Sequence, residues 1–96
     1  MRPSEALQAH RKAIRQVVAA HRAGNPRVFG SALHGNDVEG SDLDLLVDPT
    51  PETTLLDIGA IRHELFLRLG VPVDVLTPKA LPERVRAAVL AEARTI

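Results

Sequence analysis

The sequence predicts a small globular protein of mixed helices and strands, with its elements in the order α-β-β-α-β-α. Two observations predict this class. Segments with helical spacing of apolar residues alternate with short runs rich in valine and leucine, and glycine or proline separates most of them. A chain of 96 residues, 45% of them apolar, can bury one small core, so we expect a single domain over residues 1–96.

Composition narrows the classes of function. Twelve basic and 12 acidic side chains balance, which argues against a broad nucleic-acid-binding surface. The only aromatic residues are Phe29 and Phe66, too few for a base-stacking platform, and the absence of cysteine excludes disulfides and thiolate metal sites. We find neither a signal peptide nor an apolar run of about 18 residues, so we expect a cytoplasmic protein without a membrane segment.

Residues 4–23 are predicted to form the first helix. Ser4 is expected to cap its start, apolar side chains recur along one face, and Gly24-Asn25-Pro26 is expected to stop it. The opposite face is predicted to be basic, and is either a solvated surface or a contact for a nucleotide or an acidic partner. It carries Arg11, Lys12, Arg15 and Arg22.

Three strands and two further helices are predicted after the first helix. The strands cover residues 27–29, 43–47 and 71–76, and the helices cover residues 53–69 and 82–93. Thr53 or Thr54 is expected to cap the first of these helices, and Pro82 suits the first position of the last one. Residues at helical spacing form the expected apolar stripes, which are Leu55, Ile58, Ile61, Leu65, Phe66 and Leu69, and then Val85, Ala88 and Val89.

The stretch between the first two strands carries the chemistry. Asp42 and Asp44 are one residue apart at the start of an apolar strand, so their carboxylates point the same way. Two such charges repel unless a cation lies between them, and a hard divalent ion with oxygen ligands meets that need. The preceding loop, with Gly30, Ser31 and Ser41, can bring backbone N–H groups close to a phosphate. Together these features indicate phosphoryl or nucleotidyl transfer.

Asp74 is a third informative carboxylate. It lies between two valines in the third predicted strand, where burial is costly unless the group is paired or bound to metal. If that strand lies beside the second, Asp74 can join Asp42 and Asp44 around one or two Mg²⁺ ions, with nucleotide phosphates as further ligands. The alternative is that Asp74 is an exposed edge residue or a partner for Arg27.

These residues resemble a known family. Gly30-Ser31, an interval of ten residues, Asp42-x-Asp44 and a later strand Asp74 are similar to the minimal nucleotidyltransferases of the DNA-polymerase-β-like superfamily. In particular, the chain resembles the small antitoxins of this class that pair with HEPN-domain toxins, and the resemblance covers almost its whole length. It implies an α+β fold of two layers, in which helices back a small mixed β-sheet.

The resemblance also implies an activity and a set of roles. Asp42 and Asp44 would bind two Mg²⁺ ions, and Asp74 would bind the catalytic ion and help to activate the acceptor hydroxyl. Gly30 and Ser31 would hold the phosphates of ATP. Relatives in the antitoxin branch transfer AMP from ATP to a tyrosine of the HEPN toxin and so silence its ribonuclease activity. This chain has no tyrosine, so a tyrosine-directed reaction would act on another chain.

One position departs from the family pattern. The family commonly has Gly-Ser-x-Ala-Arg-Gly in the loop, whereas this sequence has His34 at the arginine position. We include His34 and Ser41 with Gly30 and Ser31 as nucleotide-binding residues, and expect weaker or pH-dependent phosphate binding because histidine titrates near pH ~6.5. The alternative is a solvated His34. Lys79 is either a compensating cation or an ordinary exposed lysine.

Two other functions compete with adenylyl transfer to a protein. A non-catalytic antitoxin would neutralise its partner by covering the partner's active site, with apolar helical faces such as residues 81–89 as the interface. A nucleotidyltransferase acting on small molecules would need an added acceptor-binding domain. The sequence leaves open whether the chain forms a homo-oligomer.

Overall fold

A four-stranded mixed sheet is the frame of this computed structural model, which describes all 96 residues. The strands lie in the order β3-β2-β1-β4, and β3 runs parallel to β2 while the other neighbouring pairs are antiparallel. The mixed sheet implied by the family resemblance is therefore confirmed. The strands are β1 (Ala23–Phe29), β2 (Leu43–Pro49), β3 (Val73–Leu76) and β4 (Arg94–Thr95).

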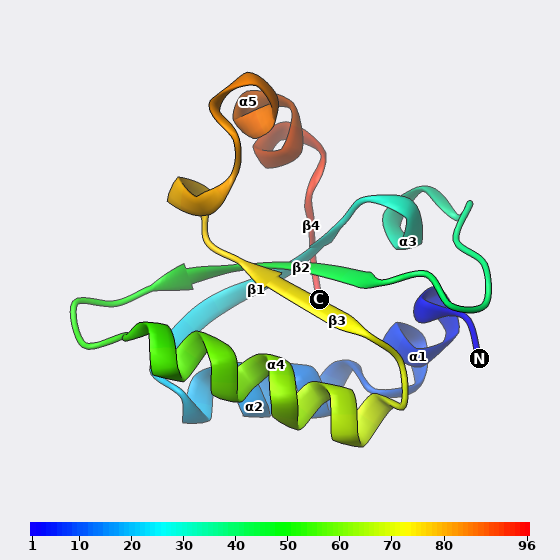
Figure 1. Cartoon of the computed structure of the whole chain (residues 1–96), viewed down its shortest axis with the longest axis horizontal. Helices are drawn as coiled ribbons and strands as arrows, with labels where there is room; N and C mark the ends of the chain where they lie inside the picture. The colour runs from blue at the N-terminus through cyan, green and yellow to red at the C-terminus, as the bar shows by residue number, and fades with distance from the viewer.

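The helices divide between the two sides of this sheet. Figure 1 shows α2 and α4 side by side below the sheet, while α5 stands out on the other side. No helix in the chain combines the length and the apolar character that a membrane crossing requires. The helices are α1 (Pro3–Ala9), α2 (Arg11–Ala20), α3 (Ser31–His34), α4 (Leu55–Leu69) and α5 (Glu83–Glu92), with a 3₁₀ turn η1 (Pro78–Ala80).

The core lies between the sheet and the layer of α2 and α4. Alternate residues of β2, namely Leu43, Leu45 and Val47, are fully buried there, as the alternating pattern predicts. They belong to one apolar cluster with Ile14 of α2 and Ile61 of α4. Asp44, between two of the buried residues, must therefore project from the other face of the sheet.

The prediction of one helix over residues 4–23 is wrong, because two helices with a break at His10 occupy this segment. The first packs on α3 and β2 and the second on β1, so contacts with different elements override a continuous helix. Arg2, and not Ser4, is the N-cap of α1. The backbone N–H of Ser4 instead donates to Asp37 Oδ2 at 2.8 Å.

Gly24-Asn25-Pro26 lies inside β1 and does not end a helix, so the first strand is longer than predicted. Helix α2 ends at Ala20, before this tripeptide. The register of β1 against β2 shifts between Gly24 and Arg27, and Asn25 has a φ of 47°. This irregularity accommodates Pro26, which has no N–H to give to a regular ladder.

The last helix is close to the predicted range, but two neighbouring features were missed. Pro82 is the N-cap of α5 and not its first residue. The two-residue strand β4 pairs with β1, and the N–H of the buried Ile96 donates to the Pro26 carbonyl at 3.0 Å. The η1 turn was also missed. Elements of two or three residues are too short to show an apolar period.

The predicted apolar stripes are only partly buried. In α4 the core-facing positions are one turn apart, at Ile61, Leu65 and Leu69. Leu55 is 90% exposed and Phe66 is 48% exposed, so they lie outside that stripe. In α5 no residue is buried, and Ala88 is exposed. These helices therefore present apolar side chains to their surroundings.

Candidate active site

The register of two parallel strands brings two predicted site residues together. Asp44 of β2 is paired with Asp74 of β3. Paired residues on neighbouring strands share a face of the sheet, with backbones about 5 Å apart. The third strand therefore lies beside the second, as the prediction required. Arg27 forms its ion pair with Asp48, so it is not the partner of Asp74.

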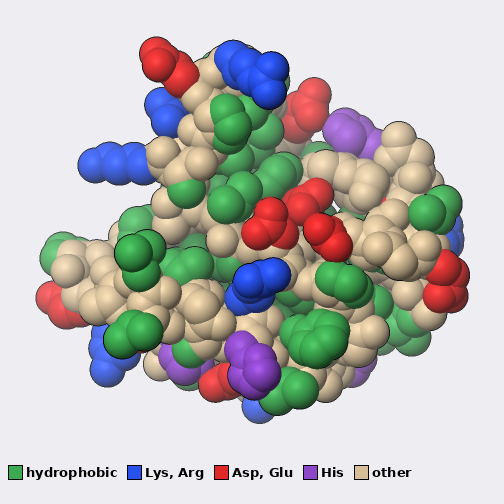
Figure 2. All heavy atoms as spheres, in the orientation of Figure 1, with side chains coloured by type: hydrophobic (Ala, Val, Ile, Leu, Met, Phe, Trp, Pro, Cys, Tyr) green, Lys and Arg blue, Asp and Glu red, His purple; other side chains and the backbone are tan.

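Asp42 completes a group of three carboxylates around Asp44. Burial of Asp44, followed by the charges of Asp74 and Asp42, raises the pKa of the Asp44 carboxyl from 3.8 to about 6. Asp42 itself is exposed, and Asp44 and Asp74 are half-buried. Figure 2 shows acidic side chains gathered near the centre of this face of the molecule. The site concentrates negative charge beside the ordered backbone of the sheet.

The oxygen donors of this group fit a hard divalent cation such as Mg²⁺. The pKa of Asp44 is raised first by burial and then by the charges of Asp74 and Asp42, and a bound cation would favour its ionised form. No set of three or more His, Cys, Asp or Glu side chains in the chain already converges at ligand geometry. The roles of Asp42, Asp44 and Asp74 as metal ligands therefore stay a prediction.

Gly30 is packed against Asp44. Its φ of 75° and ψ of −153° lie in a region that almost only glycine adopts. A Cβ built at Gly30 would collide with Asp44 Oδ2. The sequence predicted a glycine here for close approach to a phosphate. The structure adds that Gly30 leaves room for the Asp44 carboxylate.

The predicted phosphate loop begins at the end of β1, next to Asp44. Phe29, the last residue of β1, pairs with Asp44, and Gly30 is the N-cap of α3. The N–H groups of Ser31 and Ala32 have no backbone acceptor, as expected for the first residues of a helix. The first four residues after Gly30 form the short helix α3, so this loop begins with a helical turn.

Ser41 and His34 lie further along the loop and already have partners. Ser41 Oγ accepts the N–H of Val38 at 3.1 Å, so this hydroxyl shapes the turn before Asp42. His34 Nε2 lies 3.1 Å from Glu92 Oε2 of α5, at the wall of a pocket of about 310 Å³. Both stay candidate nucleotide-binding residues. Lys79 is exposed on η1 and belongs to none of the ion pairs in the chain.

The basic side chains of the first helical segment do not border the carboxylates. Helix α2 covers the face of the sheet opposite Asp44 (Figure 1), so Lys12 and Arg15 lie exposed on the far side of the molecule. Arg22 pairs with Asp57 at 3.0 Å. The basic side chains of this face therefore lie away from the three carboxylates, and contact with an acidic partner stays a prediction.

Asp37 is a structurally important residue that the sequence analysis missed. It is 3% exposed, and Oδ2 accepts the Ser4 N–H while Oδ1 is buried without a partner. The hydrogen bond from the Ser4 backbone lowers the pKa of Asp37. Asp37 thus ties the loop before β2 to α1. One aspartate in a polar loop gives no sequence signal for such a role.

The fold and this site define a class of enzyme, and comparison with known proteins agrees. The model of the nucleotidyltransferase domain family matches residues 10–96, so the chain belongs to that family. It is a nucleotidyltransferase, as the resemblance of its loop and aspartates implied. A structure provisionally described as a minimal nucleotidyltransferase aligns with a TM-score of 0.86 and 42% identity, over 97% of this chain and 95% of that one.

Two curated relatives of the chain are named as protein adenylyltransferases. The chain is 34% identical over 86 residues to protein adenylyltransferase MntA of Thermococcus cleftensis, which covers 90% of this chain and 84% of MntA. It is 31% identical over 83 residues to a Methanocaldococcus jannaschii protein named provisionally for the same activity, covering 86% and 89% of the two chains. The crystal structure of a toxin–antitoxin with AMP-PNP shares the fold, with a TM-score of 0.74 and 16% identity over 88% of this chain and 69% of that chain.

Proposed function

We propose that this nucleotidyltransferase transfers AMP from ATP to a tyrosine hydroxyl of a partner protein, and that the partner is a HEPN ribonuclease toxin. The cytoplasm is the proposed setting. The observation that carries the proposal is the pairing of Asp44 with Asp74 beside Gly30 and the start of α3. The names of the curated relatives, and a toxin–antitoxin structure with the same fold, support the choice of a protein acceptor.

In the proposed reaction, the acceptor oxygen forms a bond to the α-phosphorus of ATP while the bond to the bridging oxygen breaks and pyrophosphate leaves. Gly30, Ser31 and the adjoining N–H groups bind the triphosphate, with Ser41 and His34 as further contacts. Asp42, Asp44 and Asp74 are the residues that would hold Mg²⁺. When bound, the metal balances charge that develops on the phosphorus and the leaving oxygen. Asp74 Oδ is the proposed acceptor for the hydroxyl proton.

Intact-mass spectrometry of the protein with its proposed HEPN partner, ATP and Mg²⁺ tests this proposal. We expect the partner to gain the mass of one or more AMP units, and Asp42→Asn to abolish the gain. Asp48→Asn is a matched control, because it makes the same change on β2 at a carboxylate that pairs with Arg27. Transfer by Asp42→Asn at the wild-type rate would refute the role of these carboxylates.

A binding-only antitoxin is the second candidate, and the exposure of α5 favours it. No residue of α5 is buried; Val85 and Val89 are half-buried, and Leu90 is 39% exposed. Such a helix can cover a partner without chemistry. A stable complex in which the partner's mass never changes would establish this function in place of transfer.

A further inference from the structure

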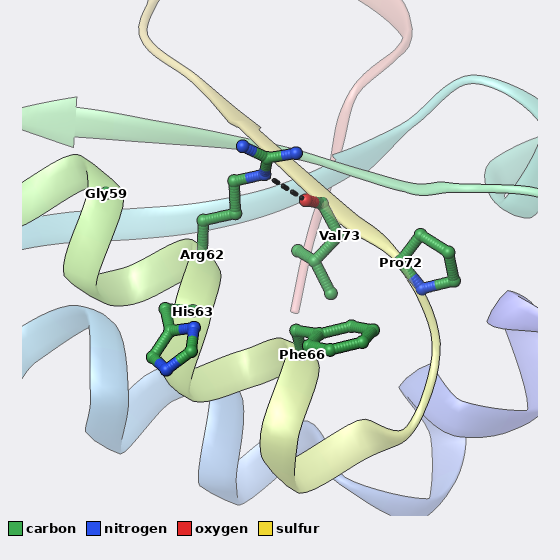
Figure 3. Close-up of a pocket in the computed structure, with 6 residues that line it drawn as sticks. All are labelled: Gly59, Arg62, His63, Phe66, Pro72 and Val73. Carbon is green, nitrogen blue, oxygen red and sulfur yellow. Dashed lines mark hydrogen bonds between the residues drawn. The ribbon is translucent and has the colours of Figure 1, made fainter.

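A pocket of about 350 Å³ lies between α4 and β3, outside the group of carboxylates. Figure 3 shows its lining side chains, which come from one side of α4 and from the start of β3. We call it the α4–β3 pocket. It is lined by Gly59, Arg62, His63, Phe66, Pro72 and Val73.

The lining of the α4–β3 pocket has a distinct chemistry. Two of its side chains, Arg62 and His63, can donate hydrogen bonds to an acidic group, and none of its side chains is acidic. Phe66, one of only two aromatic residues in the chain, leaves 48% of its surface exposed there. Exposed arginine and aromatic side chains are the residue types that most often dominate protein–protein binding.

Arg62 is held in place at this pocket. Its Nε donates to the Val73 carbonyl at 3.2 Å, which lays the guanidinium across β3 (Figure 3). Neither Nη of Arg62 takes part in a hydrogen bond or ion pair within the chain, so both remain available to an acidic group. An arginine that is already ordered loses less entropy on binding.

The α4–β3 pocket lies next to β3, whereas the predicted phosphate loop at Gly30 lies on the other side of β2. Val73, in its wall, directly precedes Asp74, so these two side chains face opposite sides of the sheet. Because β3 is the edge strand, a segment docked at the pocket can pass around this edge to reach Asp74. The loop at Gly30 follows β1, on the other side of β2. In an in-line displacement the acceptor enters opposite the leaving group. With pyrophosphate held at the Gly30 loop, the acceptor would approach from β3.

We propose that the α4–β3 pocket docks the acceptor segment of the partner protein, an acidic segment with an apolar or aromatic side chain near the modified hydroxyl. Arg62 and His63 bind its acidic group, and Phe66 with Pro72 packs against its apolar side chain. This inference rests on the proposed function, because it names how the acceptor reaches Asp74.

Charge reversal and truncation within the pocket test the inference. Arg62→Glu and Phe66→Ala change exposed pocket residues. As controls on exposed positions of α4 outside the pocket, Arg68→Glu repeats the charge reversal and Leu67→Ala truncates another apolar side chain. For each purified variant we would measure the Kd for the proposed HEPN partner without nucleotide, and the KM values for this partner and for ATP in the transfer assay. Thermal unfolding would verify that each variant is folded.

We expect both pocket variants to raise the Kd and the KM for the partner by about tenfold or more, while the KM for ATP stays within about twofold. The two controls should match the wild type. Equal effects of pocket and control variants would overturn the inference. A raised KM for ATP alone would make the pocket part of the nucleotide site, and loss of self-association alone in sedimentation would make it a contact between copies.

Different results would refute the proposed transfer activity and the proposed docking role of the pocket. A wild-type protein that binds the partner without transferring AMP would remove the proposed activity, while the Kd values would still decide whether the pocket docks the partner. Transfer that is unaffected by Arg62→Glu and Phe66→Ala would keep the activity and remove the docking role. A partner that does not bind the wild type at all would refute both.

Discussion

Gly30 and Asp44 show how closely backbone and chemistry are joined at the level of single residues. Gly30 has a φ of 75° and contacts the Asp44 carboxylate. Its lack of a Cβ therefore both permits this backbone conformation and leaves space for the carboxylate. The Gly-Ser and Asp-x-Asp pattern located this pair in the sequence. The contact between them could not be read from the pattern, because it depends on the pairing of β1 with β2.

Gly30→Ala is expected to lower the transfer rate strongly, because the new methyl group would displace the Asp44 carboxylate. It should also destabilise the fold by at least about 1 kcal/mol, the usual cost of a positive φ at a residue with a Cβ. Gly35→Ala is the control, since Gly35 has a φ of 74° but no atom within 4 Å of its added Cβ. Equal transfer rates for the two variants would contradict the steric argument.

Asp44 should make stability depend on pH in a defined direction. Its pKa is raised from 3.8 to about 6, so the folded state holds this proton more tightly than the unfolded state. Its stabilising contribution is therefore complete below about pH 4 and lost as the pH rises through about 6. Without divalent metal, Asp44→Asn should raise the Tm relative to wild type at pH 7 more than at pH 4.

Thermal unfolding of both proteins from pH 4 to 8, in EDTA and in Mg²⁺, would measure this effect. Mg²⁺ should stabilise the wild type above pH 6 and should stabilise Asp44→Asn much less, since the variant lacks a charged oxygen donor. Parallel Tm curves for the two proteins in EDTA would show that folding does not raise the pKa of the Asp44 carboxyl.

At the level of elements, local signals predicted β2 and α4 well. The alternation of Leu43, Asp44 and Leu45 identified both the strand and its two faces. The prediction of Thr53 or Thr54 as the cap of α4 is resolved in favour of Thr54, whose hydroxyl accepts the Asp57 N–H at 3.2 Å. The Asp57 carboxylate accepts the Thr54 N–H in return at 2.9 Å.

Thr54→Ala should cost about 1 kcal/mol of stability, because it leaves an N–H at the start of α4 without its acceptor. Thr54→Ser keeps the hydroxyl and should lose much less. Denaturant unfolding would measure both, and an unchanged slope against denaturant would show that only stability changed. Equal losses in the two variants would mean that the methyl group of Thr54, and not its hydroxyl, is important.

Local signals could not predict the break between α1 and α2 or the strand β4. Each depends on residues distant in the sequence. Helix α1 packs on α3 and β2 while α2 packs on β1, and the Ile96 N–H meets Pro26. No local propensity encodes such contacts, so the sequence favoured one long helix and omitted the last strand.

At the level of the whole molecule, the asymmetry of the sheet separates stability from function. One face is covered by α2 and α4, whereas the face with Asp44 and Asp74 lies on the side of α5 (Figure 1). Helix α5 buries none of its own residues. Its C-terminal end is held by β4 and Ile96, which pair with β1 and Pro26, and by the contact of Glu92 with His34.

Ile96→Ala should loosen α5 with little effect on the layer of α2 and α4. We expect the amides of α5 to exchange hydrogen much faster, while those of α4 keep their protection. Leu90→Ala, a truncation on α5 at a residue already 39% exposed, should leave both patterns unchanged. Uniformly faster exchange over the whole chain would show instead that Ile96 supports the entire core.

The pairing of Asp44 with Asp74 also links activity to correct assembly of the sheet. Side chains alternate between faces along a strand, so sliding β3 by one residue against β2 would turn Asp74 toward the apolar core and expose its two neighbouring valines. The penalty for burying that carboxylate opposes the slip. A molecule with the wrong strand alignment would thus be both less stable and unable to place Asp74 next to Asp44, so no partly active misaligned form should accumulate.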